Sequence, residues 1–103
     1  MVIKSKIRDH RSPHLKHLFS LLSQGKAAAV INKVDALLLD FPYSSDLYNL
    51  KGASLKKQGD FVKAKTSFLK AIEFKPNSAN LHNNLGLTLD ALDDYKGAIS
   101  RFK

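Results

Sequence analysis

Three histidines near the amino terminus are the residues best suited to metal chemistry in this sequence. His10, His14 and His17 are spaced so that a helix would align their imidazoles on one face, which suits zinc or nickel. However, Ser12 and Pro13 indicate a helix start, because proline is favoured in the first turn. His10 would then precede the helix, while His14 and His17 would pack inward. We therefore expect no metal site.

The remaining polar residues do not form a pattern typical of an active site. The sequence has no serine-hydrolase signature, no glycine-rich phosphate loop and no zinc-protease motif. It also has no cysteine, which excludes disulfides and thiolate chemistry. Asp93 and Asp94 are adjacent carboxylates, but we expect them in a solvated surface turn between two helices. The sequence predicts a protein that is not an enzyme and holds no cofactor.

Composition predicts one packed domain. The chain has 103 residues, of which 44% are hydrophobic, and a net charge of +8. No apolar run approaches the ~20 residues of a membrane span. The basic segment 1–10 lacks the apolar stretch of a secretory signal, so we expect a cytoplasmic location and no membrane partner. The charge permits nucleic acid, anionic lipid or an acidic peptide as a partner.

The elements that would position a site come from an internal repeat with a 34-residue period. At this step Pro42 recurs as Pro76, and the period divides the chain into residues 11–44, 45–78 and an incomplete 79–103. Other matches at the same step are Leu21/Leu55/Leu89, Gly25/Gly59, Leu47/Leu81, Asn49/Asn83, Gly52/Gly86, Asp60/Asp94, Ala64/Ala98 and Phe68/Phe102.

Each unit has the pattern of a helix, a tight turn and a second helix. In the second unit, Ser44 or Ser45 can cap a helix, Gly59 and Asp60 supply the turn, and Pro76 ends the second helix. The second helix carries an apolar stripe at helical spacing, formed by Phe61, Ala64, Phe68, Ala71 and Ile72.

Two glycines recur inside the first helices, where glycine costs about 1 kcal/mol relative to alanine. The repeated cost predicts close packing, of Gly52 against Ala64 and of Gly86 against Ala98. The first unit has larger residues in place of small ones, which predicts that its helices lie further apart: Leu18, Val30 and Leu37.

The second unit resembles the tetratricopeptide repeat. The residues that carry the resemblance are Gly52, Leu55, the turn 59–61, Ala64, Phe68, Ala71 and Pro76. The third unit matches as far as it extends, with Asp93 where glycine usually stands. The resemblance implies an all-α superhelix of about three helical hairpins, the third truncated, with a concave groove lined by the first helix of each hairpin.

By matching positions, the resemblance implies the residues that line this groove. They are Leu15, Phe19, Leu22 and Ser23 in the first unit, Asn49, Ala53, Lys56 and Lys57 in the second, and Asn80, Asn83, Asn84, Leu87 and Asp90 in the third. The asparagine amides would hold an extended peptide backbone, and the two lysines an acidic group. Alternatively, the apolar residues Val2, Ile3 and Ile7 cover Leu15 and Phe19.

A protein-interaction scaffold is the leading hypothesis, with a homodimer through the exposed third hairpin as an accompanying expectation. The second hypothesis is a substrate-recruiting part of a larger transferase. Asn84, before a Leu–Gly pair, and the divergent first repeat resemble arrays ahead of bacterial glycosyltransferase or sulfotransferase domains. Some family members clamp acidic chaperone tails with basic residues and asparagine, and Leu15, Phe19 and Asn80 disfavour that role here.

Nucleic-acid binding is the third hypothesis, supported by the net charge and by the many lysines of the second unit. The nearby aromatic residues Phe61, Phe68 and Phe74 fall at packing positions, so none is expected to be free to stack on a base. We therefore do not expect nucleic acid to be the partner.

Overall fold

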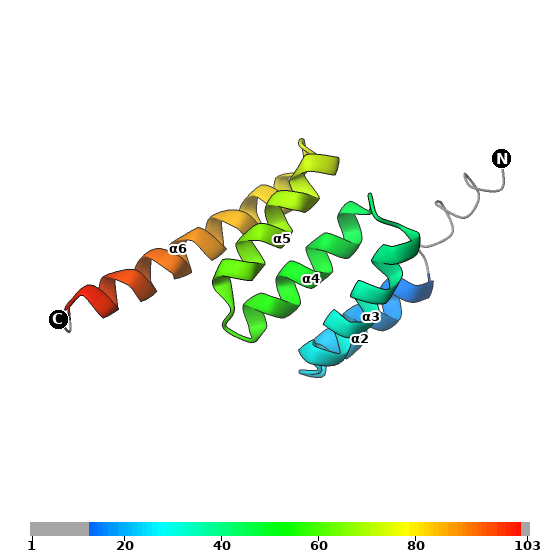
Figure 1. Ribbon diagram of the computed structural model, residues 1–103, viewed down its shortest axis with the longest axis horizontal. Helices are drawn as coiled ribbons and strands as arrows, with labels where there is room; N and C mark the ends of the chain where they lie inside the picture. The colour runs from blue at the N-terminus through cyan, green and yellow to red at the C-terminus, as the bar shows by residue number, and fades with distance from the viewer. Residues whose placement is uncertain (1–12, 102–103) are drawn as a thin grey trace.

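The computed structural model describes the backbone of residues 13–101 and the side chains of residues 15–94. This part of the chain consists of helices joined by short turns, without a β-strand, which confirms the all-α prediction (Figure 1). The helices are α2 (Pro13–Ser23), α3 (Ala27–Asp40), α4 (Ser45–Lys57), α5 (Phe61–Phe74) and α6 (Ala79–Arg101).

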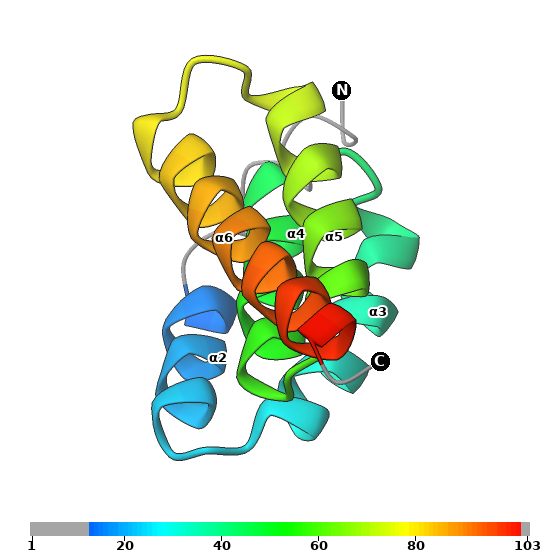
Figure 2. The ribbon, with the colours of Figure 1, turned by 90° about the vertical axis from the view of Figure 1, so that its left-hand side faces the viewer.

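The helices pair in the order in which they follow one another along the chain. α2 with α3 and α4 with α5 form two helical hairpins, α3 packs against α4, and α6 packs against α5 (Figures 1 and 2). Both hairpin turns contain a glycine in the left-handed region, Gly25 with φ of 80° and Gly59 with φ of 81°. Asp60 then caps α5 by accepting a 3.2 Å hydrogen bond from the Lys63 amide.

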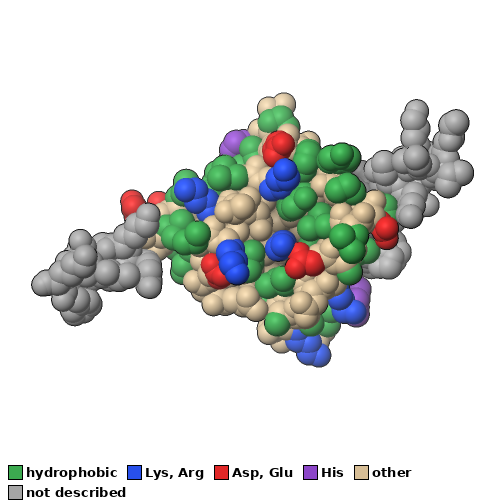
Figure 3. Space-filling view, in the orientation of Figure 1, with side chains coloured by type: hydrophobic (Ala, Val, Ile, Leu, Met, Phe, Trp, Pro, Cys, Tyr) green, Lys and Arg blue, Asp and Glu red, His purple; other side chains and the backbone are tan. Residues whose placement is uncertain are grey.

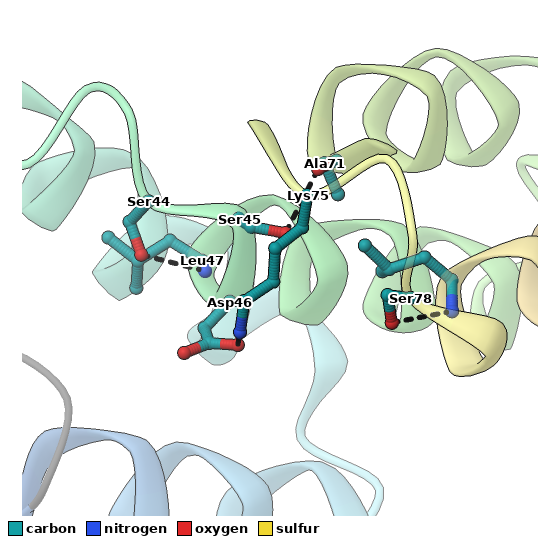
Figure 4. A network of polar contacts seen from close by, with 8 residues as sticks. Ser44, Ser45, Asp46, Leu47, Ala71, Lys75 and Ser78 are labelled. Atoms are coloured by element: carbon teal, nitrogen blue, oxygen red, sulfur yellow. Dashed lines mark hydrogen bonds and ion pairs between the residues drawn. The ribbon is translucent and has the colours of Figure 1, made fainter. Parts of the chain in front are cut away.

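Serine side chains fix the start of α4 (Figure 4). The Ser44 hydroxyl is the N-cap and accepts a 3.3 Å hydrogen bond from the Leu47 amide. The next hydroxyl, that of Ser45, donates a buried 3.0 Å hydrogen bond to the Ala71 carbonyl in α5. The two possible caps therefore have different roles, because Ser44 starts the helix and Ser45 ties that start to the last turn of α5.

Changing Ser45 to alanine should lower the free energy of unfolding by about 0.5–1.5 kcal/mol, because one buried hydrogen bond between α4 and α5 is lost while the Ala71 carbonyl keeps the Lys75 amide as a donor. Chemical denaturation of the purified protein measures this change. Ser23→Ala is the control, since its hydroxyl bonds to the exposed Ser20 carbonyl. Equal losses from the two variants would contradict a tie through Ser45.

Two clusters of buried side chains form the core. The first joins α2, α3 and α4, and the second joins α4 with α5. Ala53 is half-buried and packs against both clusters. The first cluster consists of Leu18, Leu22, Ala27, Val30, Val34, Leu47 and Leu50. The second consists of Leu55, Ala64 and Phe68.

Gly52 allows close packing, as predicted, but its partner is different. A Cβ atom at Gly52 would lie 2.7 Å from the Phe68 ring, so the aromatic ring occupies the space that was assigned to Ala64. A Cβ atom at Gly86 would meet nothing within 4 Å among the described residues. The prediction of close packing at Gly86 is therefore wrong for the arrangement that the structure shows.

The third unit differs from the predicted helix–turn–helix. The expected turn at Asp93 and Asp94 is wrong, because α6 continues through both residues as one helix of 23 residues. Asp93 occupies the repeat position at which Gly25 and Gly59 adopt positive φ. The left-handed conformation costs an L-residue about 1–2 kcal/mol. Without glycine at this position, the helix continues and does not reverse.

The first hairpin carries larger side chains between its helices. Leu18 and Val30 are buried in the first cluster, and α2 and α3 make less close contact than α4 and α5 do, as predicted. His17 was expected to pack inward and is exposed instead. Leu18 and Leu22 on the same helix face the core. Because successive residues of a helix point in different directions, His17, next to Leu18, faces away from the core.

Candidate functional site

The first helices of the repeat units lie toward the same side of the molecule. In Figure 2, α2 and the start of α6 are on the left, α3 and α5 are on the right, and α4 lies between them. The predicted groove residues belong to α2, α4 and α6, so the structure gathers their elements on one side.

A pair of asparagines links α4 to α6 on this side. The Asn84 side-chain amide donates a 3.0 Å hydrogen bond to the Asn49 side-chain oxygen, and both residues are half-buried. The two residues are 35 positions apart, so this contact joins neighbouring repeat units. Asn80 and Asn83 are exposed on the same helix as Asn84. The asparagines therefore supply amide donors and acceptors on one surface.

The lysines of the second unit fall into two groups. Lys56 is half-buried and Lys57 is exposed at the end of α4, and neither has an ion-pair partner among the residues that the structure describes. Most of the others are neutralised by acidic neighbours. The ion pairs are Lys51–Asp35 at 2.7 Å, Lys63–Asp60 at 3.9 Å, Lys70–Glu73 at 3.3 Å and Lys75–Asp46 at 4.0 Å.

The pairing of these lysines interrupts the positive surface of the protein. On the face shown in Figure 3, lysine side chains are interspersed with acidic side chains. Phe68 is buried, and Phe74 packs edge-on against Tyr43 with ring centroids 5.6 Å apart. Lys70 lies 5.5 Å from the centre of the same Phe74 ring. Of the aromatic residues considered for stacking on a base, Phe68 and Phe74 therefore already pack within the protein.

The apolar part of the predicted groove is only partly on the surface. Phe19 on α2 has 51% of its surface exposed, and Leu87 on α6 has 48%. Leu15 is half-buried and packs against the first cluster. Leu22 was predicted to line the groove, and this prediction is wrong because Leu22 is buried in the first cluster. Ser23 and Asp90 are exposed, as groove positions would be.

The structure also contains depressions that the repeat pattern did not predict. One lies at the turn between α4 and α5, where Gly59, Phe61 and Val62 face Leu92 of α6. A second lies between α2 and α3 beside His17 and Lys33, and a third follows the end of α5 at Phe74. Each of these three is lined by residues other than the predicted groove residues. The first depression forms because α6 continues as one helix through Asp93, so that Leu92 lines it. The lack of a glycine at position 93 was the sequence signal for this continuous helix.

The described part of the chain brings together no group of three or more residues able to hold a metal ion. Of the three histidines considered, His10 and the His14 side chain lie outside the described residues. None of the helices that the structure describes, α6 included, is both long and apolar enough to span a bilayer.

Antiparallel hairpins that stack in chain order, with first helices on one side, define a helical-repeat protein. Residues 52–93 match the family model described as TPR repeat, so this part of the chain is similar to a tetratricopeptide repeat. Comparisons with curated proteins and with solved structures each found no significant match. Repeats of this class are typically protein-interaction modules without catalytic activity of their own.

Proposed function

We propose that this protein is an interaction scaffold that binds an extended, acidic peptide along α2, α4 and α6. The observation that carries the proposal is the contrast among the lysines of the second unit. Lys56 and Lys57 lie in the last turn of α4 without an ion-pair partner in the described structure, whereas Lys51 and Lys63 are paired. Unpaired cations on a binding surface favour a partner that brings its own carboxylates.

The asparagines and apolar residues define what else the peptide would contact. Asn80 and Asn83 are exposed, so their amides are available to a peptide backbone, as in other extended-peptide recognition. Leu87 on α6 and Phe19 on α2 are the exposed apolar residues of the surface. The peptide that fits this surface is acidic opposite the end of α4 and apolar opposite Phe19 and Leu87.

Charge reversal at Lys56 and Lys57 should weaken peptide binding at least tenfold, since exposed ion pairs are worth up to about 1 kcal/mol each and repulsion replaces them. The measurement selects acidic peptides from a displayed library with the wild-type chain. It then compares their affinities for wild type and for Lys56→Glu with Lys57→Glu by fluorescence anisotropy. Circular dichroism checks that helicity is unchanged.

A matched control separates the groove from the overall charge. Lys63→Glu with Lys65→Glu makes the same change in net charge on exposed positions of α5. We expect this variant to bind the selected peptides as the wild type does. Equal weakening by both double variants would show that net charge alone attracts the peptide. Unchanged binding by the Lys56 and Lys57 variant would overturn the groove assignment.

The same proteins address nucleic-acid binding. A pull-down from lysate, with and without nuclease, accompanies the peptide measurement. A bound protein that survives nuclease and is lost with the Lys56 and Lys57 variant supports the scaffold. Capture that nuclease abolishes for wild type and both variants would identify nucleic acid as the partner and overturn the proposal.

A further inference from the structure

The end of α5 and the turn before α4 together carry a cluster of three aromatic side chains. Tyr43 packs edge-on against Phe74 with ring centroids 5.6 Å apart, and Tyr48 lies against the same ring at 5.9 Å. The Tyr48 hydroxyl donates a 3.1 Å hydrogen bond to the Pro42 carbonyl, which holds the Tyr48 ring in place. Because Tyr43 has 74% of its surface exposed, the cluster presents an aromatic face to solvent.

A surface depression of about 380 Å³ adjoins this aromatic cluster. It is lined by Phe74 and by the turn that follows, Lys75, Pro76, Asn77 and Ser78. In Figure 1, the α3–α4 turn and the end of α5 lie at the same, upper end of the molecule. Lys56 and Lys57 lie at the other end of α4, which has 13 residues and is therefore about 20 Å long. The depression is thus separate from the proposed peptide groove.

The lysines beside the aromatic cluster are paired with acidic neighbours. Lys75 extends to the Asp46 carboxylate at 4.0 Å, as Figure 4 shows. Lys70 lies 3.3 Å from the Glu73 carboxylate and 5.5 Å from the centre of the Phe74 ring. Because both lysines already have an acidic neighbour, they give a charged ligand little attraction. The surface therefore favours an uncharged ligand.

The polar groups at this surface include hydrogen-bond donors. The Tyr43 hydroxyl and the Asn77 side-chain amide make no hydrogen bond within the part of the chain that the structure describes, and both residues are exposed. Donors beside aromatic rings match a ligand that offers carbonyl oxygens and apolar rings. A proline-rich segment offers both, because proline has a carbonyl but no backbone N–H, and the polyproline II backbone has no internal hydrogen bonds.

Other modes of peptide binding fit this surface less well. Strand addition needs a sheet edge, and the described part of the chain has no strand. A partner helix needs a long apolar groove, whereas one aromatic residue and a short turn line this depression. Recognition of acidic motifs needs unpaired cations, and Lys70 and Lys75 are paired. Recognition of a proline-rich segment by aromatic side chains is the mode that remains.

We infer that an uncharged, proline-rich peptide in the polyproline II conformation binds at Tyr43, Phe74 and the depression beside Asn77. Its proline rings pack against the aromatic rings, and its carbonyl oxygens accept hydrogen bonds from the Tyr43 hydroxyl and the Asn77 amide. The preformed conformation of such a peptide lowers the entropy cost of binding, which suits a shallow surface. The inference is independent of the proposed groove for acidic peptides, because the two surfaces share no residue.

Fluorescence anisotropy of the full 103-residue chain tests this inference. The probe is a labelled, uncharged proline-rich peptide of about ten residues, which spans about 30 Å. We expect a dissociation constant on the order of 10–100 µM, as for a small contact. Tyr43→Ala should raise this constant at least about tenfold, because tyrosine side chains carry much of the energy at many interfaces. Tyr43→Phe loses only the hydroxyl and should raise it about threefold.

Two controls separate this surface from the rest of the protein. Phe19→Ala is the matched variant, because Phe19 is also an exposed aromatic residue but lies on α2 in the proposed groove. It should leave the dissociation constant unchanged. The second control is a peptide of the same length with alanine in place of each proline, which should bind at least about tenfold more weakly. Circular dichroism confirms that each variant is folded.

Three results would overturn the inference. The first is a lack of saturable binding up to about 1 mM protein. The second is equal binding of the alanine peptide, since the surface would then accept any extended chain. The third is a Tyr43→Ala variant that binds as the wild type does, or no more weakly than Phe19→Ala. Amide chemical shifts provide a further check, because the bound peptide should shift residues 74–78, and shifts confined to α2 and α6 would place it in the groove instead.

Discussion

Replacing Phe68 with alanine should lower the free energy of unfolding by about 3–5 kcal/mol, the usual cost of deleting a buried aromatic side chain. Phe68 has only 1% of its surface exposed and is the largest side chain of the second cluster. Its ring lies directly over Gly52, so it fills the space between α4 and α5. The loss would be a large part of the 5–15 kcal/mol that stabilises typical domains.

Chemical denaturation followed by circular dichroism measures this loss. Leu69→Ala is the control, because Leu69 is the next residue on α5 and has 46% of its surface exposed. We expect the control to lose less than about 1 kcal/mol. Similar losses at the two positions would contradict the central place given to the Phe68 ring.

Leucine at Gly52 should destabilise the protein by about 1–3 kcal/mol, although leucine favours a helix more than glycine does. A side chain at this position meets the Phe68 ring at 2.7 Å from its first carbon, and the ring is enclosed by the second cluster. The ring must move, and α4 must separate from α5. The same denaturation experiment measures the change.

Leucine at Gly86 should have the opposite effect on stability in this experiment. That position has open space, so only the gain in helix propensity remains, worth up to about 1 kcal/mol. Combining Gly52→Leu with Phe68→Ala provides a second check, because the new side chain would occupy the vacated space. The double variant should lose less than the sum of its single changes. Additive losses would indicate that the two residues do not share this space.

The sequence was most informative for the second unit because local signals agree there. Ser44 caps α4, Gly59 turns the chain and Asp60 caps α5, so each helix end has a residue suited to its backbone conformation. The buried positions Ala64, Phe68 and Ala71 also follow the predicted stripe. Close packing at Gly52 was predictable, but its partner was not, because spacing alone does not tell which side chain reaches the gap.

The third unit shows where repeat matching misleads. Gly86 matches Gly52, and the match transferred a packing contact to a helix whose partner segment does not fold back. The decisive residue was visible in the sequence, since Asp93 stands where a turn needs glycine.

The candidate groove was predicted unevenly for a similar reason. Asn49 and Asn84 come together as matching positions imply, because both lie on first helices of neighbouring units. Leu22 does not lie in the groove as predicted, because it is buried beside Leu18 in the core of the first unit, which contains larger residues. The binding role of the remaining positions stays a prediction, because it depends on a partner and not on the packing of this chain.

The position of Ala53 couples the two halves of the core. Its side chain touches both clusters, so α4 cannot loosen its contact with α5 without affecting its contact with α3. In the nearest-neighbour model of repeat proteins, a residue that packs against both units adds to the interaction energy between them, and this raises the cooperativity of unfolding. We therefore expect the two hairpins to unfold together, so that a destabilising change in one hairpin also lowers the folded population of the other.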